Sequence, residues 1–280
     1  MRYAYLEAGP RAGPLVLCLH GFPDHAPTWT HLLPALADAG FHAVAPWLRG
    51  YHPTSAASDG AYQAGALAAD ANALRAALGG DDRAAIVGHD WGAIAAYGAV
   101  NTQPERWRRV VTMAVPPLPV FQGAWRDTSQ WRRSAYIALF QLPLVPEWLA
   151  VRDDAAMIDR LYARWSRHMD PPAGYLDALK ATLTHPGTMS AALGYYRAMV
   201  NPLRRRARYA AEERAWKRLP RTPLLYLHGV HDGAMGVEYA RRASPLLPEG
   251  SRVEILERCG HFLHLERPDE VNAHILDWLA

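Results

Sequence analysis

Short apolar runs alternate with helix-forming stretches over the first 115 residues. Strands buried on both faces are predicted for the apolar runs Leu15–His20, Phe41–Ala45, Arg83–Gly88 and Val110–Val115. Helices are predicted between them at Thr28–Ala39, Ala61–Leu78 and Trp91–Thr102, and glycines follow the first two. Because strand and helix alternate with short connections, we expect a mostly parallel, doubly wound α/β sheet.

The alternation stops after Val115, where three prolines occur within four residues. From Ser129 to Met199 the pattern is helical only. Strand patterns return at 222–228 and 252–256, and a last helix is predicted from Pro268, a residue suited to a first helical turn. We therefore predict an α/β core domain of residues 1–116 and 206–280, with a helical cap (lid) domain of residues 117–205 inserted into it.

Composition narrows the class of protein. Half of the 280 residues are hydrophobic, so the chain can bury a large core and global disorder is excluded. The net charge of +3 comes from nearly balanced acids and bases. The basic run Arg204–Arg208 has no aromatic interleaving and no glycine-rich loop, which favours a solvated hinge or helix face over a phosphate site. No nucleic-acid partner is predicted.

Cysteine usage and the N-terminus bear on the compartment. The two cysteines, Cys18 in an apolar run and Cys259 in a loop, are typical of free thiols in a reducing compartment. The N-terminal stretch lacks a signal-peptide apolar region, and no apolar run has membrane-spanning length. We expect a cytoplasmic protein without a membrane span.

The stretch Ala84–Ala93 places Asp90 between Gly88 and Gly92, after an apolar run and before a helix. This pattern is typical of a nucleophile elbow, with Asp where an esterase carries Ser. The turn strains the central residue, and a Cβ at position 88 or 92 would collide across it. An aspartate that caps a helix is the common alternative, so the rest of the chain has to decide between them.

Three further segments follow predicted strands, where a doubly wound sheet gathers its chemistry. They are residues 20–23 (HGFP), the loop containing Asp232 and the loop containing His261. The order nucleophile, acid, histidine along the chain is that of the α/β-hydrolase fold. Asp24, just after the first segment, is expected to be a solvated loop acid.

The same loops offer candidate metal ligands. The sets to consider are His228, His231 and Asp232, or His261 with His264. Their spacings match no zinc pattern, and the α/β-hydrolase order explains these positions without a metal. We therefore predict neither a metal nor any other cofactor.

The chain resembles the α/β-hydrolases and, within them, the epoxide hydrolases. The shared motifs are HGFP at 20–23, APWLRGY at 45–51, GHDWG at 88–92, the late Asp232 and GHFLHLERP at 260–268. The resemblance covers nearly the whole length and implies an α/β-hydrolase fold with an inserted helical cap. The family's usual lead-in before the HG strand is short here, so the first sheet edge is expected to be reduced.

The roles of these residues follow from their chemistry. The Asp90 carboxylate can open a strained ring and form an alkyl ester. His261, oriented by Asp232, can then take a proton from the water that attacks the ester. The backbone N–H groups of Phe22 and Trp91 are the expected oxyanion donors, since one follows the HG turn and the other the nucleophile.

The resemblance also implies two tyrosines from the cap that hold the epoxide oxygen. One lies in Tyr136-Ile137-Ala138-Leu139-Phe140-Gln141 and the other in Tyr195-Tyr196-Arg197-Ala198-Met199. We assign Tyr136 and Tyr196, with Tyr195 as the second choice for the latter. The plainer interpretation is that both are amphipathic-helix residues with a phenol at the water boundary.

Several other activities compete with epoxide opening. A haloalkane dehalogenase uses similar residues, but position 22 is Phe where many such enzymes carry a halide-binding Asn. Fluoroacetate dehalogenases follow the nucleophile with Arg, whereas Trp91 stands here, and a serine esterase is disfavoured by Asp90. Another α/β-hydrolase acting on small apolar substrates stays an alternative. A hydrolase fold retired to a binding role would lack a catalytic residue, and none is missing.

The expected substrate is a small hydrophobic epoxide, with water as the second reactant. The residues expected to line its pocket are mostly aromatic: Phe22, Trp91, Pro116, Phe121, Trp125 and Phe140. The sequence leaves open which epoxide is used, which ring carbon is attacked, and whether the chain forms a homodimer.

Overall fold

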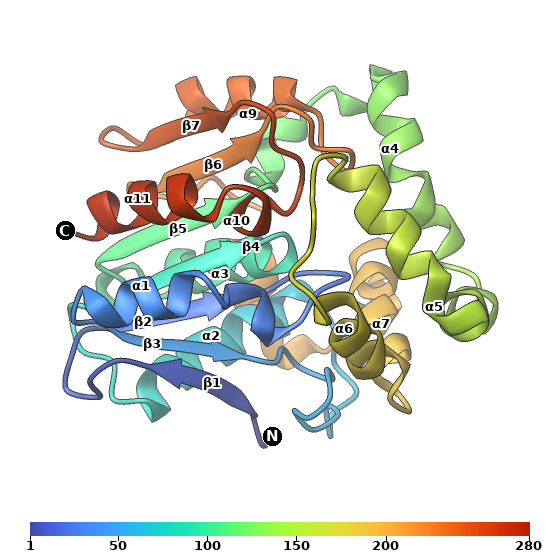
Figure 1. The fold of residues 1–280 in the computed structure, drawn as a ribbon, viewed down its shortest axis with the longest axis horizontal. Coiled ribbons are helices and arrows are strands. Elements are labelled where there is room, and N and C mark those ends of the chain that lie inside the picture. The colour runs from blue at the N-terminus through green and yellow to red at the C-terminus, as the bar shows by residue number, and fades with distance from the viewer.

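A twisted β-sheet runs through the protein, whose computed structural model describes all 280 residues except the side chain of Trp125 (Figure 1). Among the described residues its strands are ordered β1-β3-β2-β4-β5-β6-β7. Their bounds are β1 (Tyr5–Ala8), β2 (Leu15–Leu19), β3 (His42–Pro46), β4 (Ala85–His89), β5 (Arg109–Met113), β6 (Leu225–Gly229) and β7 (Arg252–Leu256). The strand order places β2, β4 and β5 in the middle of the sheet.

All neighbouring strands are parallel except the first pair. β1 lies antiparallel to β3, with Tyr5 opposite Pro46, whereas β2 and β4 run parallel with Leu17 opposite Ile86. The apolar pattern missed β1 because this short edge strand alternates between exposed and half-buried residues and has no continuous apolar run. The first edge of the sheet is therefore a single four-residue strand.

Helices cover both faces of the sheet because successive strand residues point to opposite sides. On β2, Leu17 packs into the core formed with α2 (Ala64–Ala77) and α3 (Trp91–Thr102). Its neighbour Val16 packs on the other face with α1 (Leu32–Asp38) and α11 (Pro268–Leu279). This two-sided burial explains why the strands read as unbroken apolar runs.

The chain between β5 and β6 forms four of the longer helices, which we call the cap helices. They are α4 (Thr128–Leu139), α5 (Val145–Trp165), α6 (Tyr175–Thr184) and α7 (Thr188–Val200), and they lie beyond the ends of the parallel strands (Figure 1). The shorter helices of the chain are α8 (Ala210–Ala215), α9 (Val237–Ala243) and α10 (Leu263–Glu266). The exact domain boundaries at 117 and 205 stay a prediction.

Local signals explain how the cap helices begin and bend. The Asp127 side chain accepts the N–H groups of Ser129 and Gln130 and so caps α4. Helix α5 is interrupted at Arg152–Ala155, where three successive residues have φ values of 52–54°. Its second half therefore runs separately toward its end at Trp165.

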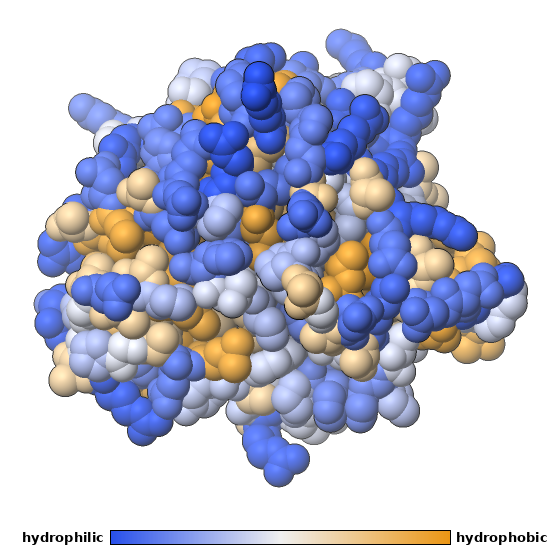
Figure 2. Space-filling model, in the orientation of Figure 1, coloured by the Kyte–Doolittle hydropathy of each residue, from blue (hydrophilic) through white to orange (hydrophobic). Residues whose placement is uncertain are grey.

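The surface is mainly hydrophilic on the face shown in Figure 2, with an apolar area at the end of the cap helices. The exposed large apolar residues of that region include Leu142, Leu144, Val145, Trp148 and Val151. None of the helices in the described part of the chain is both long and apolar enough to cross a membrane.

Candidate active site

Asp90 occupies a strained turn between β4 and α3. Its backbone angles are φ 52° and ψ −114°, and it precedes the first residue of α3. A Cβ on Gly88 would collide with the Gly92 carbonyl, and one on Gly92 would collide with that of Leu19. The two glycines therefore let the elbow close, and Asp90 keeps 7% of its surface exposed.

The two carboxylate oxygens of Asp90 have different partners. Oδ1 accepts the backbone N–H of Phe22 at 2.8 Å. Oδ2 lies 3.7 Å from Nε2 of His261. Trp91 is the first residue of α3, so its N–H has no acceptor within that helix. One oxygen thus accepts a backbone N–H while the other faces a histidine.

Asp232 and His261 complete the arrangement from the loops after β6 and β7. Nδ1 of His261 lies 2.9 Å from Oδ2 of Asp232. The other oxygen of Asp232 accepts the N–H groups of Ala234 and Met235 at 2.7 and 2.8 Å. All three predicted residues, Asp90, Asp232 and His261, therefore meet at one site, with the carboxylates on opposite sides of the imidazole.

Charge controls the protonation of this histidine. Burial lowers the pKa of His261, but the charge and hydrogen bond of Asp232, with the Asp90 carboxylate, outweigh burial and raise that pKa to about 10. Burial raises the pKa of Asp232, yet the His261 charge holds it below its usual value. The Asp232 and Asp90 side chains thus favour the imidazolium form of His261.

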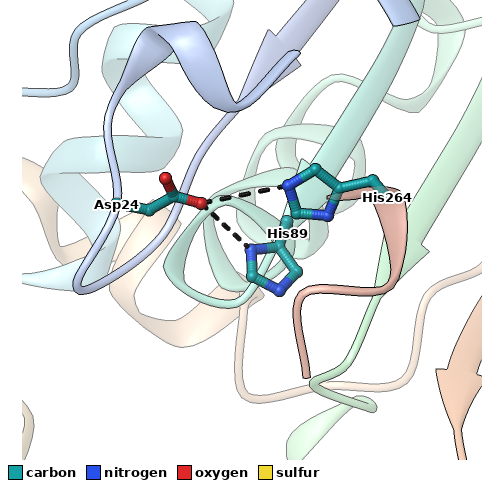
Figure 3. Close-up of side chains that lie close together, drawn as sticks. All are labelled: Asp24, His89 and His264. Carbon is teal, nitrogen blue, oxygen red and sulfur yellow. Dashed lines mark ion pairs between the residues drawn. The ribbon is translucent and has the colours of Figure 1, made fainter. Parts of the chain in front are cut away.

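A second buried cluster lies next to this site and contains Asp24, His89 and His264 (Figure 3). The expectation that Asp24 is solvated was wrong, because its side chain is fully buried. Its Oδ1 accepts the hydroxyls of Tyr175 and, at 3.4 Å, Tyr162, both from the cap helices. The packing of distant helices onto the loop, which no local pattern encodes, removes Asp24 from water.

The hydrogen bonds fix the proton positions on His89. Its Nε2 lies 2.9 Å from the carbonyl oxygen of His261, so Nε2 must carry the hydrogen that is donated. Its Nδ1 faces Oδ2 of Asp24 at 3.9 Å, and neither atom has a hydrogen-bond partner among the described residues. Burial lowers the pKa of His89 to about 4 and raises the pKa of Asp24 to about 7.

We tested this cluster for its fit to a metal ion. The three candidate ligand atoms lie within 4.8 Å of one another, and Oδ2 of Asp24 is 3.9 Å from Nε2 of His264. Ligands of a tetrahedral zinc ion are closer, roughly 3.3 Å apart. Nε2 of His264 is also 2.6 Å from the Thr28 hydroxyl. The cluster is therefore wider than a zinc site, and one of its donors already has a partner.

The cap helices bring two tyrosines to the cavity that Asp90 lines. Tyr136 of α4 and Tyr196 of α7 meet edge to face with ring centres 5.7 Å apart. The Tyr196 hydroxyl is buried and has no hydrogen-bond partner in the described part of the chain. Burial, followed by neighbouring groups that include the Asp90 charge, raises the pKa of both phenols. Both therefore stay protonated and can donate.

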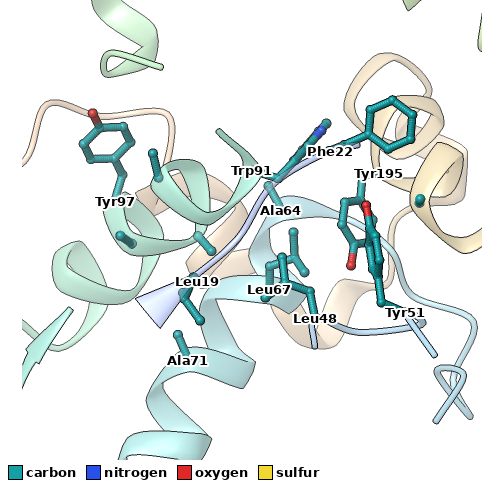
Figure 4. Close-up of a cluster of buried hydrophobic side chains, with 14 of the residues drawn as sticks. Leu19, Phe22, Leu48, Tyr51, Ala64, Leu67, Ala71, Trp91, Tyr97 and Tyr195 are labelled. Atoms are coloured by element: carbon teal, nitrogen blue, oxygen red, sulfur yellow. The ribbon is translucent and has the colours of Figure 1, made fainter. Parts of the chain in front are cut away.

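Tyr195, the second choice for this position, points elsewhere. Its hydroxyl donates to the Arg49 carbonyl at 2.6 Å, and its ring packs among buried residues below Trp91 (Figure 4). Phe22 and Phe140, which were expected to line the pocket, instead pack edge to face against each other and against Tyr196. They support a tyrosine rather than line the cavity, which corrects the prediction for these two residues.

The cavity has a volume of about 330 Å³. Trp91, Pro116 and Phe121 line it as expected, whereas the predicted Trp125 side chain lies outside what the structure describes. Sequence reasoning missed other lining residues: Ile94, Tyr97, Leu118, Gln130, Trp131, Met199, Trp216 and Met235. The spacing of Trp91, Ile94 and Tyr97 along one face of α3 was the available signal.

The polar atoms of two large wall residues are occupied by partners inside the protein. The Tyr97 hydroxyl lies 3.0 Å from Thr112 Oγ1 and 2.9 Å from the Val115 carbonyl. Nε1 of Trp216 donates to Glu213 at 3.1 Å. Because these groups are satisfied, that part of the wall offers a ligand mainly carbon atoms.

A mostly parallel sheet with a nucleophile, an acid and a histidine in this chain order beyond its strand ends is characteristic of the α/β-hydrolases, here with Asp in place of the usual Ser. A sequence model of the alpha/beta hydrolase fold matches residues 14–268 of this chain. The protein therefore belongs to the α/β-hydrolase family, as the resemblance implied.

Known relatives narrow the assignment of this chain within the α/β-hydrolase family. Epoxide hydrolase A of Mycobacterium tuberculosis is 30% identical over 308 residues, covering 100% of this chain and 94% of that protein. The AB hydrolase superfamily protein YfhM of Bacillus subtilis is 29% identical, covering 97% and 92%. The crystal structure of epoxide hydrolase A from Mycobacterium thermoresistibile is similar with a TM-score of 0.79 and 30% identity, covering 99% and 94%. The chain is thus an epoxide hydrolase-like α/β-hydrolase.

Proposed function

We propose that this protein hydrolyses small apolar epoxides to vicinal diols through an ester on Asp90. The observation that carries the proposal is the buried, unpartnered Tyr196 hydroxyl in the same cavity as the Asp90 carboxylate. A buried donor without an acceptor is costly, and an epoxide oxygen would satisfy it. Relatives named epoxide hydrolases support the same activity.

In the first step, Oδ2 of Asp90 attacks a ring carbon, and the bond from that carbon to the epoxide oxygen breaks. Tyr136 and Tyr196 donate to the oxygen as negative charge develops, and one of them supplies its proton. Oδ1 remains on the Phe22 N–H, which orients the carboxylate. The products of this step are a hydroxyalkyl ester and a tyrosinate.

Formation of the ester also prepares the second step. The Asp90 carboxylate is one of the groups that raise the pKa of His261, and the ester removes its charge. The pKa of His261 therefore falls, so the imidazolium can return a proton to the tyrosinate, and the neutral imidazole can then take a proton from water. Water oxygen then attacks the ester carbon, and the N–H groups of Phe22 and Trp91 stabilise the charge on Oδ1. As the intermediate collapses, the departing alkoxide takes the proton from His261 and leaves as the diol, and the Asp90 acid gives its remaining proton to His261, which restores the carboxylate and the imidazolium.

Two finer features belong to the same proposal. The apolar cavity wall supports a substrate whose non-reacting part carries no hydrogen-bonding groups. Cys18 and Cys259 are buried free thiols, which supports residence in a reducing compartment such as the cytoplasm.

A single turnover in H₂¹⁸O tests the mechanism, because the water oxygen enters Asp90 and not the first diol formed. With excess enzyme over styrene oxide, we expect unlabelled diol and ¹⁸O in the peptide that contains Asp90. Halide release from haloalkanes, measured in parallel, should be slower than diol formation. Label in the first diol would exclude the ester, and faster halide release would identify a dehalogenase instead.

A further inference from the structure

The end of cap helix α5 is bonded to both loops that carry the triad partners of Asp90. The Trp165 carbonyl accepts two backbone N–H groups, one from Gly233 at 3.1 Å and one from His261 at 3.0 Å. Ser166 follows Trp165, and its Oγ accepts the N–H of Phe262 at 2.9 Å. Gly233 is next to Asp232, and Phe262 is next to His261. Two adjacent cap residues thus join the acid loop to the base loop.

Close packing at both loops depends on glycine. A Cβ on Gly233 would collide with the Arg164 carbonyl, and one on Gly260 would lie 2.6 Å from both the Trp165 carbonyl and Cα of Ser166. Gly233 and Gly260 both lie outside the left-handed region of positive φ, so backbone conformation does not require glycine there. Both loops therefore use glycine to admit the same two cap residues.

The contacts of Trp165 and Ser166 with the two loops, which we call the junction, are buried. They hold the His261 imidazole from a second side. Trp165 and Ser166 are 1% and 2% exposed. The Trp165 ring contacts the His261 ring with centres 5.2 Å apart. The C-terminal end of a helix carries partial negative charge, which favours a cation such as the His261 imidazolium nearby.

We propose that Trp165 and Ser166 are positioning residues for His261, so that the cap is a built-in part of the catalytic machinery. The inference rests on the two-step mechanism proposed above. Asp90 and the tyrosines perform the first step, and no described hydrogen bond joins any of them to Ser166. Tyr136 contacts the Trp165 ring, with centres 5.1 Å apart, so the variants below leave Trp165 in place. His261 acts in the second step. Loosening the junction should therefore slow hydrolysis of the ester and leave its formation unchanged.

Ser166→Ala removes the acceptor of the Phe262 N–H with little change in volume. Acid quenching at millisecond intervals, followed by intact-protein mass spectrometry with styrene oxide, gives the rates at which the ester forms and decays. We expect decay to slow roughly 10- to 100-fold, the scale of a small misplacement of a catalytic group, while formation keeps the wild-type rate. Ser190→Ala is the matched control, since Ser190 is an exposed cap serine bonded to Glu147.

Gly260→Ala provides an independent variant, because its Cβ would push against Ser166 without removing a hydrogen bond. Both variants are assayed below their melting temperatures, and both should show the selective loss of ester decay. Equal slowing of formation and decay, or wild-type decay in both variants, would overturn the positioning role. Failure of the wild type to form any ester on Asp90 would instead overturn the proposed function.

Discussion

Two buried Asp–His pairs lie next to each other in this protein and have opposite electrostatics. Asp232 bonds His261 at 2.9 Å, and the pKa of that histidine rises to about 10. Asp24 faces His89 at 3.9 Å, and burial instead moves the two pKa values to about 7 and about 4. The His89 and His261 rings are only 4.8 Å apart at their centres.

The difference shows that residue type and burial do not decide the charge of such a pair. All four side chains are at most 1% exposed. Where the hydrogen bond forms, the attraction between the charges exceeds the cost of burying them, and an ion pair results. Where the atoms are too far apart to bond, burial favours the neutral forms. The shorter separation, together with the Asp90 side chain that also raises the pKa of His261, thus distinguishes the first pair from the second.

Breaking the hydrogen bond between Asp232 and His261 should have the largest effect on the rate of ester hydrolysis. Asp232→Asn removes the charge that raises the pKa of His261 and favours the wrong tautomer of the imidazole. Hydrolysis of the ester should slow by about 10³–10⁴-fold, as for the equivalent change in a Ser-His-Asp triad. Rapid quenching and mass spectrometry should show the ester accumulating on the Asp90 peptide. Wild-type turnover by this variant would remove Asp232 from the site.

The hydroxyls of Tyr136 and Tyr196 act in the other step of the proposed reaction, the formation of the ester. The double change Tyr136→Phe and Tyr196→Phe should slow ester formation by about 10²–10⁴-fold, the usual range for general acid catalysis. Each single change leaves one donor and should cost less. Single-turnover rates with styrene oxide measure this, and circular dichroism checks the fold. Unchanged epoxide activity in the double variant would contradict a role for these hydroxyls.

The hydrogen-bonded pair of Asp232 and His261 should also affect the free energy of unfolding at alkaline pH. The pKa of His261 in the folded protein is about 10, above its ordinary value of 6.5, so the folded state holds the proton more tightly. The resulting contribution of His261 to the free energy of unfolding is fully present below pH 6.5 and is lost as the pH rises through about 10. Urea unfolding at steps across this window should show a steeper loss in the wild type than in Asp232→Asn. Parallel slopes for the two proteins would argue against the ion pair.

The unbonded pair should give the smallest effect on activity. The pKa of Asp24 in the folded protein is about 7 against an ordinary value of 3.8, so the protonated side chain stabilises the fold at low pH, and this contribution is lost as the pH rises through about 7. Asp24→Asn cannot ionise and keeps the acceptor for Tyr175. Urea unfolding should show the variant losing less stability than the wild type between these pH values, with turnover nearly unchanged. A steeper loss in the variant would reverse the assignment.

Much of the core could be predicted from local patterns. The predicted bounds of α3, β7 and α11 agree with the structure because their apolar runs begin or end at glycine, proline or strongly polar residues. Asp90, Asp232 and His261 could be selected together since each follows a strand, and the carboxyl ends of parallel strands meet at one edge. In these cases the deciding information lies within a few residues.

The features that were missed depend on contacts between distant segments. Asp24 looks like a loop acid in the sequence, and it is buried by Tyr162 and Tyr175 from helices far along the chain. Phe22 was assigned to the cavity wall, but its ring turns toward Phe140. The junction joins the Trp165 carbonyl and the Ser166 hydroxyl to backbone N–H groups of distant loops, and no local sequence pattern encodes these contacts.

The position of the cap helices within the chain has a consequence for folding. Strands β5 and β6 pair directly, with Met113 opposite Leu227, although every cap helix lies between them in sequence. Such non-local pairing is slow to form, and until it does, β5 presents an open apolar edge that can associate with other chains. The nucleophile loop belongs to the part made first, whereas Asp232 and His261 arrive with the last two strands. Closing the sheet with β6 and β7 therefore also brings Asp232 and His261 to Asp90.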